Sequence, residues 1–334
     1  MAKLTFWADD GCLFSGITGL VDALAIANLW HGHGAEGAAA APLFETEVVT
    51  SDGEPVKAHG GFHIHADRSI SDIGKTDMIF IPPFLPHMDP MPRSLDRFLA
   101  WAVERYRSGT PIAAMCTGTF VLAESGLLDG RAATTNWYFT RLFRQRYPWV
   151  RLQPERILTE DGGLICSGAS TAIFHLGLFV IARFGSPELA AACAKALLVD
   201  PSQDSQAPYM ISDFSKHHHD RPIRQAQRWL ETRFHEPVTV DAVAAAVGLS
   251  PRHFKRRFKN ATGETPIGYL QRVRIAAAKK RLESTRDAVN EITWQIGYED
   301  SSSFRRLFKK HTGLSPRAYR DKFSLPEGAR RRAL

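Results

Sequence analysis

Short apolar runs alternate with helical patterns over the first 200 residues of the chain. The runs read as buried strands, and the stretches between them repeat apolar positions with helical spacing. This alternation predicts an α/β domain, a sandwich built on a mostly parallel sheet. The predicted strands are residues 4–7, 44–50, 78–81 and 112–115, and the clearest predicted helices are residues 20–27 and 95–107.

The last third of the chain contains a repeat at an offset of 50 residues. Each copy has the pattern of a helix, a tight turn and a second helix, so the sequence predicts an all-α domain with two helix-turn-helix units. The residues Phe254, Phe258, Thr262, Gly263, Pro266 and Tyr269 recur as Phe304, Phe308, Thr312, Gly313, Pro316 and Tyr319.

The first copy carries the start and stop signals of two short helices. Thr239 is placed to cap the first helix, and Gly248 supplies the backbone freedom of a tight turn. Ser250 is placed to cap the second helix, with Pro251 at its first position. Gly263 is a natural C-terminal stop.

Basic residues follow the second helix of each copy, away from the phenylalanine face. They are Arg252, Lys255, Arg256 and Lys259 in the first copy, and Arg305, Arg306, Lys309 and Lys310 in the second. A helix of this size fits the DNA major groove, where Arg or Lys reaches guanine edges. A helix starting at Thr265–Pro266 links the copies, and we expect it to hold them about one DNA turn (~34 Å) apart.

Charge is distributed unevenly between the two parts. The 334-residue chain has 42 Lys and Arg against 35 Asp and Glu, a net charge of +7. Residues 1–210 carry 16 basic and 22 acidic side chains, whereas residues 211–334 carry 26 and 13. The net charges are therefore −6 and +13, which indicates that the second part meets a polyanion.

The overall composition excludes several other classes of protein. A hydrophobic content of 44% and a charged content of 23% are ordinary for a globular protein and exclude disorder and collagen-like repeats. No apolar run reaches the roughly 18–20 residues of a membrane span, so no membrane association is expected. Four cysteines without a CxxC pair favour neither a disulfide framework nor a zinc site, and a reducing cytoplasm is the expected compartment.

Residues 221–323 resemble the AraC-type DNA-binding domain over both helix-turn-helix units, the linking helix and the final turn. The resemblance implies base contacts by Arg252, Lys255 and Arg256 from the first unit, and by Ser302, Ser303 and Arg306 from the second. Serines are weaker hydrogen-bonding readers than arginines, so we expect the second unit to contribute less specificity. The other basic residues are expected to contact phosphate, which positions the protein without specifying sequence.

Cys116 directly follows the predicted strand 112–115 and directly precedes a helical pattern. This is the arrangement of a nucleophile elbow, where a side chain stands above a sheet at a helix N-terminus. The helix dipole is expected to lower the thiol pKa. Gly118 is expected to allow close packing at the turn.

The run from Cys116 to Trp137 resembles the PfpI-like, class I glutamine amidotransferase-like fold, a flavodoxin-like sandwich. Within that fold it is similar to one branch, the GlxA-like AraC-family transcription regulators, which use this fold as a sensor domain. The resemblance spans nearly all 334 residues. It implies a cytoplasmic regulator of transcription.

Catalytic residues of that fold are missing at three places. Thr117 stands where PfpI-like hydrolases have a histidine, and Ser15 stands where related folds have a carboxylate. The loop that often supplies an oxyanion-binding Gly-Gly contains two prolines, Pro82 and Pro83, which have no N–H to donate. Asn136 and His175 also depart from the branch, which often has His and Asp there. We therefore expect no catalytic residue and no enzyme activity.

A ligand pocket stays plausible at the carboxyl ends of the strands. Its expected lining residues are Cys116, Thr117, Asn136 and Trp137. Two alternatives stay open, because Trp137 also suits the core and Asn136 also suits a helix cap. Neither a cofactor nor a metal is expected.

The predicted organisation is a sensor domain at 1–205, a linker at 206–220, a DNA-binding domain at 221–323 and a basic tail at 324–334. The partners that the resemblance implies are double-stranded promoter DNA, a small metabolite that contains nitrogen, a second copy of the chain in a homodimer, and RNA polymerase. Two alternative functions remain. One is a cysteine-dependent amidohydrolase or glyoxalase-like enzyme fused to a DNA-binding domain, and the other is an architectural DNA binder.

Overall fold

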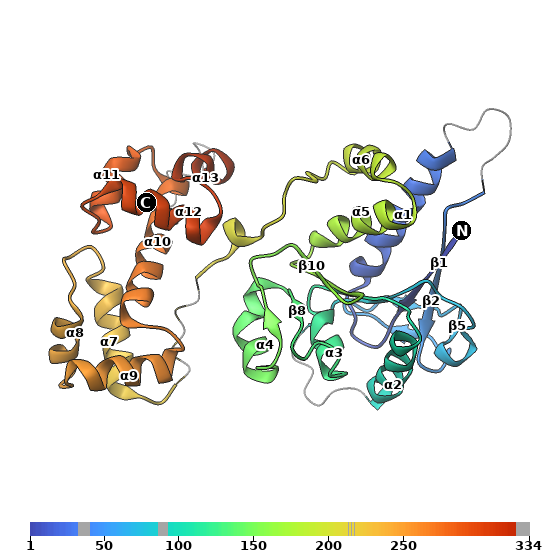
Figure 1. Ribbon diagram of the computed structural model, residues 1–334, viewed down its shortest axis with the longest axis horizontal. Coiled ribbons are helices and arrows are strands. Elements are labelled where there is room, and N and C mark those ends of the chain that lie inside the picture. The colour runs from blue at the N-terminus through green and yellow to red at the C-terminus, as the bar shows by residue number, and fades with distance from the viewer. Residues whose placement is uncertain (33–40, 86–92, 213, 215, 217, 325–334) are drawn as a thin grey trace. The chain divides into compact units, whose positions relative to one another are not determined.

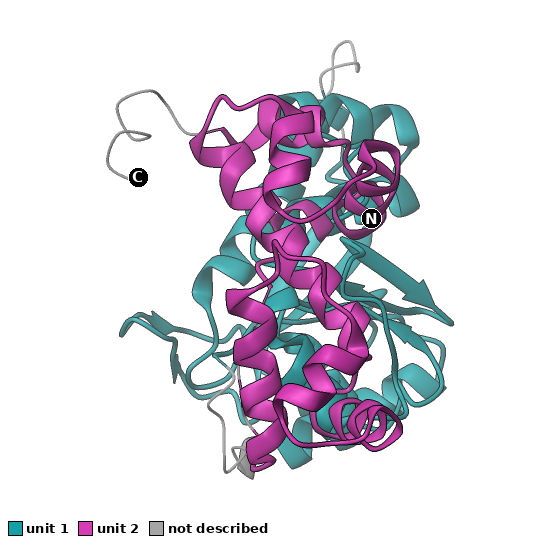
Figure 2. Ribbon diagram, turned by 90° about the vertical axis from the view of Figure 1, so that its left-hand side faces the viewer, with its two compact units in different colours: residues 1–206 teal, residues 207–334 magenta. Residues whose placement is uncertain are grey.

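The chain folds into two compact units, Met1–Gln206 and Ala207–Leu334, in a computed structural model (Figure 2). The described residues are 1–32, 41–85, 93–212, 214, 216 and 218–324. Of the predicted basic tail at 324–334, residues 325–334 lie outside the described residues.

Unit 1 is built on a seven-stranded sheet with the order β10-β11-β7-β6-β1-β2-β5. Neighbouring strands are parallel except β10 and β11, so the prediction of a mostly parallel α/β sheet is confirmed. The strands are β1 (Ala2–Trp7), β2 (Phe44–Thr50), β5 (Arg68–Ser69), β6 (Met78–Ile81), β7 (Ile112–Met115), β10 (Leu158–Asp161) and β11 (Leu164–Ser167). Two small ribbons pair β3 (Val56–Lys57) with β4 (His63–Ile64) and β8 (Ala132–Ala133) with β9 (Arg151–Leu152).

Helices cover both faces of the sheet (Figure 1). One face carries α1 (Phe14–Gly32), α5 (Ala172–Phe184) and α6 (Pro187–Ala196); the other carries α2 (Arg93–Arg107) and α3 (Gly118–Glu124). The helix α4 (Thr140–Arg146) follows the short 3-10 helix η2 (Trp137–Phe139), and two further 3-10 turns are η1 (Ile70–Asp72) and η3 (Ala207–Tyr209). Because both faces are covered, the central strands β6 and β7 are buried at every position.

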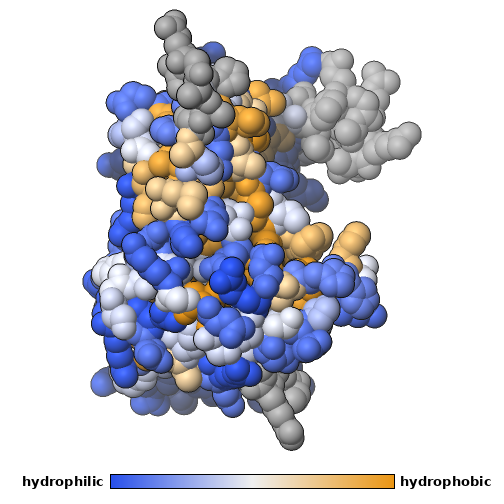
Figure 3. Space-filling view, turned by 90° about the vertical axis from the view of Figure 1, so that its right-hand side faces the viewer, coloured by the Kyte–Doolittle hydropathy of each residue, from blue (hydrophilic) through white to orange (hydrophobic). Residues whose placement is uncertain are grey.

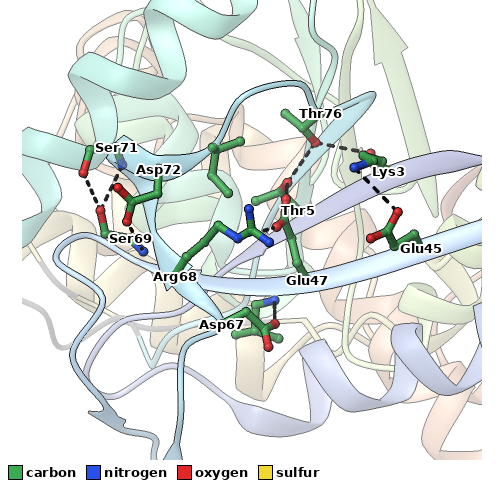
Figure 4. Close-up of polar contacts among 12 residues, drawn as sticks. Lys3, Thr5, Glu45, Glu47, Asp67, Arg68, Ser69, Ser71, Asp72 and Thr76 are labelled. Atoms are coloured by element: carbon green, nitrogen blue, oxygen red, sulfur yellow. Dashed lines mark hydrogen bonds and ion pairs between the residues drawn. The ribbon is translucent and has the colours of Figure 1, made fainter.

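A polar network ties one edge of this sheet together (Figure 4). The buried hydroxyl of Thr5 on β1 lies 2.8 Å from a carboxylate oxygen of Glu47 and 2.9 Å from the hydroxyl of Thr76. Arg68 on β5 reaches the same Glu47 carboxylate at 3.2 Å. Every member has a partner, so this cluster fixes the edge strands and leaves no buried polar group for a ligand.

Unit 2 is all-α, and the predicted pair of helix-turn-helix units is present. Its helices are α7 (Arg221–Thr232), α8 (Val240–Ala246), α9 (Pro251–Thr262), α10 (Pro266–Ser284), α11 (Val289–Gln295), α12 (Ser301–Thr312) and α13 (Pro316–Phe323). The first helix-turn-helix consists of α8 and α9, and the second of α11 and α12.

Unit 2 contains two separate hydrophobic cores, one for each helix-turn-helix. Phe254, Phe258 and Tyr269 belong to the first core, and their counterparts at an offset of 50 residues belong to the second. The long helix α10 contributes Val273 to the first core and Ile275 to the second. It therefore joins the two units, as the sequence predicted.

The segment expected as a linker makes several contacts with the helices of unit 2. The ammonium group of Lys279 donates to the backbone carbonyls of Pro208 and Met210, at 3.0 and 2.6 Å. Lys216 pairs with Glu231 at 2.8 Å. These contacts attach the described residues from 207 onward to unit 2, although their polar composition alone suggested a solvated chain.

Hydrophobic residues also lie on the surface, and Figure 3 shows a group of them in the upper half of one face. Single exposed side chains such as Trp149 (76% exposed) and Leu198 (94% exposed) belong to unit 1. Scattered exposure of this kind is normal for folded proteins. Among the described residues, no helix has the length and apolar character needed to cross a membrane.

Candidate DNA-reading helices and sensor site

Helix α9 presents a basic face opposite its buried phenylalanines. Phe254 and Phe258 are fully buried, whereas Arg252, Lys255 and Arg256 are exposed. Among the described residues, none of these three cations forms an ion pair. They are therefore available for phosphate oxygens or base edges.

The turns around α9 have the predicted geometry. Gly248 and Gly263 have φ of +68° and +81°, values that suit glycine far better than other residues. Thr239 accepts a hydrogen bond from the amide of Ala242 and so caps α8. Ser250 stands at the N-cap of α9, but its side chain makes no capping bond there. The predicted cap position is right, and the predicted bond is absent.

Arg257 lies on the same helix but has a structural role. Its guanidinium donates twice to the carboxylate of Asp220, both times at 2.9 Å. Burial favours a higher pKa for Asp220, but the bonds from Arg257 and from the amide of Ile223 outweigh it and hold that pKa below its usual value. The sequence gave no sign of this pair, because Asp220 lies 37 residues away in the expected linker.

Helix α12 presents a different surface. Asp300 caps it by accepting from the amides of Ser302 and Ser303, at 3.0 and 2.8 Å. The guanidinium of Arg306 donates to the Ser303 hydroxyl at 3.2 Å, and that of Arg305 donates to Asn290 at 3.0 Å. The second reader therefore has exposed polar groups that are already partly engaged with one another.

Cys116 forms the expected elbow at the carboxyl end of β7. Its φ is +54°, a strained value for a residue with a side chain, and it is only 3% exposed. Gly118 opens α3 so close to the neighbouring loop that a Cβ there would lie 2.5 Å from the carbonyl oxygen of Pro82. Glycine is therefore required for this packing.

The prediction of a lowered thiol pKa is wrong. Burial raises the pKa of Cys116, because the ionised sulfur would lose its hydration. The amide of Asn136, whose Nδ2 lies 3.6 Å from Sγ, opposes this shift, as do backbone groups of Thr117 and Ser170. Their combined effect is smaller than that of burial, so Cys116 is a neutral thiol.

In the loop opposite Cys116, the first backbone amide after the two prolines is already hydrogen-bonded within the protein. After the two prolines, the amide of Phe84 donates to the hydroxyl of Thr117 at 3.0 Å, and that hydroxyl donates back to the Phe84 carbonyl. From α1, Gly16 faces this loop, since a Cβ on it would lie 2.4 Å from Pro83 Cδ. Ser15, expected in the place of a carboxylate, is exposed.

Asn136 has the capping role, one of the two roles that the sequence left open. Its Oδ1 accepts from the amide of Tyr138 at 3.1 Å and caps η2, while its Nδ2 faces Cys116. Trp137 is half-buried and packs edge-to-face with Tyr138. Among the described residues it stands outside the main core of unit 1. Cys116 and Asn136 are thus in contact, and Trp137 is the next residue in the chain.

Gln206 is a functional candidate that the sequence reasoning missed. It is 4% exposed, and its Oε1 accepts from the amide of Ala169 at 3.0 Å. Its Nε2 lies within donating distance of the carbonyls of Thr135 and Arg156, at 2.9 and 3.1 Å. Thr135 precedes Asn136, and Ala169 precedes Ser170, so the last residue of unit 1 joins both segments that border Cys116.

A cleft of about 300 Å³ lies in unit 1, lined by none of the four residues expected from the sequence. One wall is the segment leading to Gln206, and another is α5. His175 on α5 bonds to the Asp200 carbonyl at 3.1 Å through Nε2, while its buried Nδ1 has no partner among the described residues. The lining residues are Arg156, Ile157, Leu158, His175, Leu178, Phe179, Pro201, Gln203 and Asp204.

Comparisons with known proteins agree with both halves of this architecture. Residues 38–183 match the DJ-1/PfpI family, and residues 243–322 match a helix-turn-helix domain. The HTH-type transcriptional regulator CdhR of Pseudomonas aeruginosa is 27% identical over 90% of this chain and 86% of its own length. The HTH-type transcriptional regulator GlxA of Rhizobium meliloti is 25% identical over 64% and 66%, respectively.

A third relative matches a shorter part of the chain. The HTH-type transcriptional activator RhaS of Salmonella arizonae is 39% identical over 30% of this chain and 36% of its own length. The enzyme alternative is not favoured, because these relatives are transcriptional regulators and the two domains occur in the same order. The chain is a transcriptional regulator in which a DJ-1/PfpI domain precedes a helix-turn-helix DNA-binding domain, and in this architecture it is similar to the AraC-family regulators CdhR and GlxA.

Proposed function

We propose that unit 1 senses a small metabolite that contains nitrogen and that its occupancy controls how unit 2 binds promoter DNA. The observation that carries the proposal is the position of Gln206, whose side chain is bonded to the two segments that border Cys116 and whose backbone leads directly into unit 2. A ligand changes DNA affinity only if it binds one arrangement of the protein better than another. Gln206 supplies a contact that such a ligand would alter.

The proposed ligand site consists of Cys116, Thr117, Asn136 and Trp137. The neutral thiol and the Asn136 amide are short polar groups that orient a ligand without an opposing charge. The ring of Trp137 suits a cationic nitrogen, since ammonium groups bind over indole faces. Thr117 holds the adjoining loop through Phe84, so its side chain positions the site.

Coupling from this site to the DNA would pass through the segments bonded to Gln206. A ligand that displaces the Asn136 amide from Cys116 would move Thr135, whose carbonyl accepts from Gln206. Release of Gln206 would free the chain between the two units. By linkage, bound DNA must then change ligand affinity by the same factor.

The test is a thermal-shift screen of the full-length protein with amino acids and quaternary amines, followed by DNA binding with and without each hit. A ligand of the folded state raises the melting temperature, and Asn136→Ala should remove that rise. Gln206→Ala should keep the rise but lose the effect of the ligand on DNA affinity. Gln145→Ala is the matched control, because Gln145 is exposed on α4 and lines neither candidate site.

Two results would contradict the proposal. One is a hit whose thermal shift is the same in Asn136→Ala, and the other is a Gln206→Ala variant that still responds on DNA. The cleft beside α5 is the second candidate site. There Leu178→Trp would fill the cavity, so a hit blocked by this variant and not by Asn136→Ala assigns the ligand to the cleft.

We also propose that Cys116 performs no catalysis. A nucleophilic thiol needs ionisation and an oxyanion-binding site, whereas this thiol is neutral and the Phe84 amide is occupied. Cys116→Ser should therefore preserve ligand-dependent regulation. Loss of regulation together with loss of a measurable amidohydrolase or glyoxalase activity would support an enzyme instead.

The proposal extends to the partners and the compartment. We expect a homodimer that binds promoter DNA and contacts RNA polymerase, working in the cytoplasm beside the DNA. The four cysteines are free and buried, which agrees with a reducing compartment. Light scattering of the full-length protein tests the dimer directly, and a monomer at micromolar concentration would contradict it.

A further inference from the structure

One arginine stands where the two cores of unit 2 meet. Arg274 lies on α10 between Val273, which packs in the first core, and Ile275, which packs in the second. Its side chain is half-buried. A charged residue at this junction calls for an explanation, because burying charge is costly unless its donors are satisfied.

The guanidinium of Arg274 contacts both halves of unit 2. Its Nε donates to the carbonyl of Phe234 at 2.7 Å, and its Nη2 donates to the carbonyl of Glu236 at 2.9 Å. Both carbonyls belong to the loop between α7 and α8, just before the first helix-turn-helix. The other side of the same guanidinium faces the ring of Tyr298, 5.0 Å from its centroid, in the turn of the second helix-turn-helix.

The two halves approach each other closely at this point. Gly297, in the same turn, lies so near that a Cβ on it would come 2.8 Å from the Phe234 carbonyl and 2.9 Å from Arg274 Nη2. Phe234 also packs its ring against both cores. The contact therefore joins backbone, aromatic ring and guanidinium, and it adds a second connection between the halves beside α10 itself.

Arginine is the residue type that suits this place. Its planar fork reaches two carbonyls while its face stacks on an aromatic ring, whereas lysine offers a point charge on a flexible stem. Methionine has a side chain of similar length to the aliphatic part of arginine but has no hydrogen-bond donor. Replacing Arg274 would leave two carbonyls without their partner and leave α10 as the main link between the halves.

We propose that Arg274 fixes the spacing between recognition helices α9 and α12, and so determines the distance between DNA half-sites that the protein accepts. A rigid pair of readers has its geometry set before binding, whereas a hinged pair must be ordered on the DNA. Arg274 is a positioning residue here, since its donors are bonded within the protein. The inference rests on both recognition helices contacting DNA.

The test uses full-length protein and duplexes selected from a random DNA library by the wild type. Within the selected two-part motif, the spacer is then shortened or lengthened by one base pair, which turns one half-site by about 34–36° and shifts it by about 3.4 Å. The wild type should lose about tenfold in affinity for each altered spacer. Arg274→Met should bind the selected spacing about tenfold more weakly but lose less than about threefold on the altered spacers. Its affinity for a single half-site should be unchanged.

Control variants separate positioning from stability. Arg272→Met removes another α10 arginine, which pairs with Glu264 and stacks on Tyr269. This variant should keep the spacing profile of the wild type. Arg274→Lys keeps the positive charge and should fold even if Arg274→Met does not. It should still broaden the spacing profile, because one ammonium group cannot bond to both carbonyls and stack on Tyr298 as the planar guanidinium does.

Three results would overturn the inference. The first is an unchanged spacing profile in both Arg274 variants, and the second is an equal loss on single half-sites. The third is a selected motif with only one block of bases, which would mean that one helix alone reads DNA. That third result would leave sequence-specific DNA binding itself intact.

Discussion

The two helix-turn-helix copies of unit 2 share one internal frame. The paired phenylalanine rings lie 5.5 Å apart in the first copy and 5.6 Å apart in the second. Thr262 and Thr312 each donate to the carbonyl four residues earlier, and each copy ends on a glycine with positive φ. Tyr269 and Tyr319 each donate to a glutamate on a neighbouring helix. The two copies are therefore alike in the residues that pack and bond inside them.

The outward faces of the two copies differ. In the first, Arg252, Lys255 and Arg256 are exposed and lack ion pairs among the described residues. In the second, Ser303 and Arg306 bond to each other at 3.2 Å, next to the Asp300 cap. The comparison teaches that packing selects the frame, while the reading surface is free to diverge. The predictions below test each part of that statement, from the largest effect to the smallest.

The shared frame predicts equal damage from equal truncations. Phe258→Ala and Phe308→Ala should each lower the free energy of unfolding by about 3–5 kcal/mol, because each removes a fully buried ring from its own core. Urea unfolding followed by circular dichroism measures the loss. Trp294→Ala is the control, since that indole is 69% exposed and should cost far less. A large loss from only one phenylalanine would break the equivalence of the two cores.

The divergent faces predict unequal effects on DNA. Arg256→Ala should cost about 1–3 kcal/mol of binding free energy and relax sequence preference at one base position. Arg306→Ala should cost less, because the second reader offers mainly serine hydroxyls and its arginine is already bonded to Ser303. Binding to a library of single-base operator variants measures both effects.

The contrary outcomes of that experiment are informative. A uniform loss across all sequences in Arg256→Ala would move Arg256 to the residues that contact phosphate. A larger loss of preference in Arg306→Ala would make the second copy the main reader. Either result would reverse the comparison drawn from the two surfaces.

Residues that contact phosphate should behave alike in both copies. Lys259 and Lys309 occupy matching exposed positions near the ends of α9 and α12. Lys259→Ala and Lys309→Ala should each weaken binding uniformly across sequences and reduce the slope of log affinity against log salt by about 1. Titrations at several salt concentrations measure the slope. An unchanged slope in one variant would place that lysine away from the DNA backbone.

Local patterns account for most of what the sequence could predict. The strands at 44–50, 78–81 and 112–115 match β2, β6 and β7, because they are apolar runs with clear boundaries. The helix-turn-helix frame follows from helical spacing, glycines and prolines in each copy. The hairpin of β10 and β11 was missed, although Gly162 and Gly163 between the two strands both have positive φ and mark a tight turn.

Contacts between distant residues could not be predicted in this way. Asp220 and Gln206 looked like linker residues, yet one anchors Arg257 and the other joins the segments beside Cys116. The pKa of Cys116 depends on how much water reaches the sulfur, and that is decided by packing around the elbow. The motif predicted the position of the Cys116 thiol, whereas burial determined the direction of its pKa shift.

Helix capping gives the finest distinction between the two copies. Asp300 accepts two backbone amides at the start of α12. The side chain of Ser303, together with the amides of Ser302 and Ser303, holds the pKa of Asp300 below its usual value. Ser250 makes no side-chain bond at the start of α9. Asp300→Ala should therefore destabilise unit 2 at about pH 7, whereas Ser250→Ala should leave its melting temperature nearly unchanged.

The acid dependence of that difference is fixed by the direction of the pKa shift. A carboxyl group whose pKa is lower in the folded state stabilises the fold fully above its unfolded pKa of about 4, and the contribution disappears as the pH falls through the folded value. The melting-temperature gap between wild type and Asp300→Ala should therefore shrink as the pH falls from about 5 into the acid range, with no such trend for Ser250→Ala. A gap that persists at the lowest pH would show that Asp300 acts on α12 as a neutral hydrogen-bond acceptor, and the two caps would then differ in geometry and not in charge.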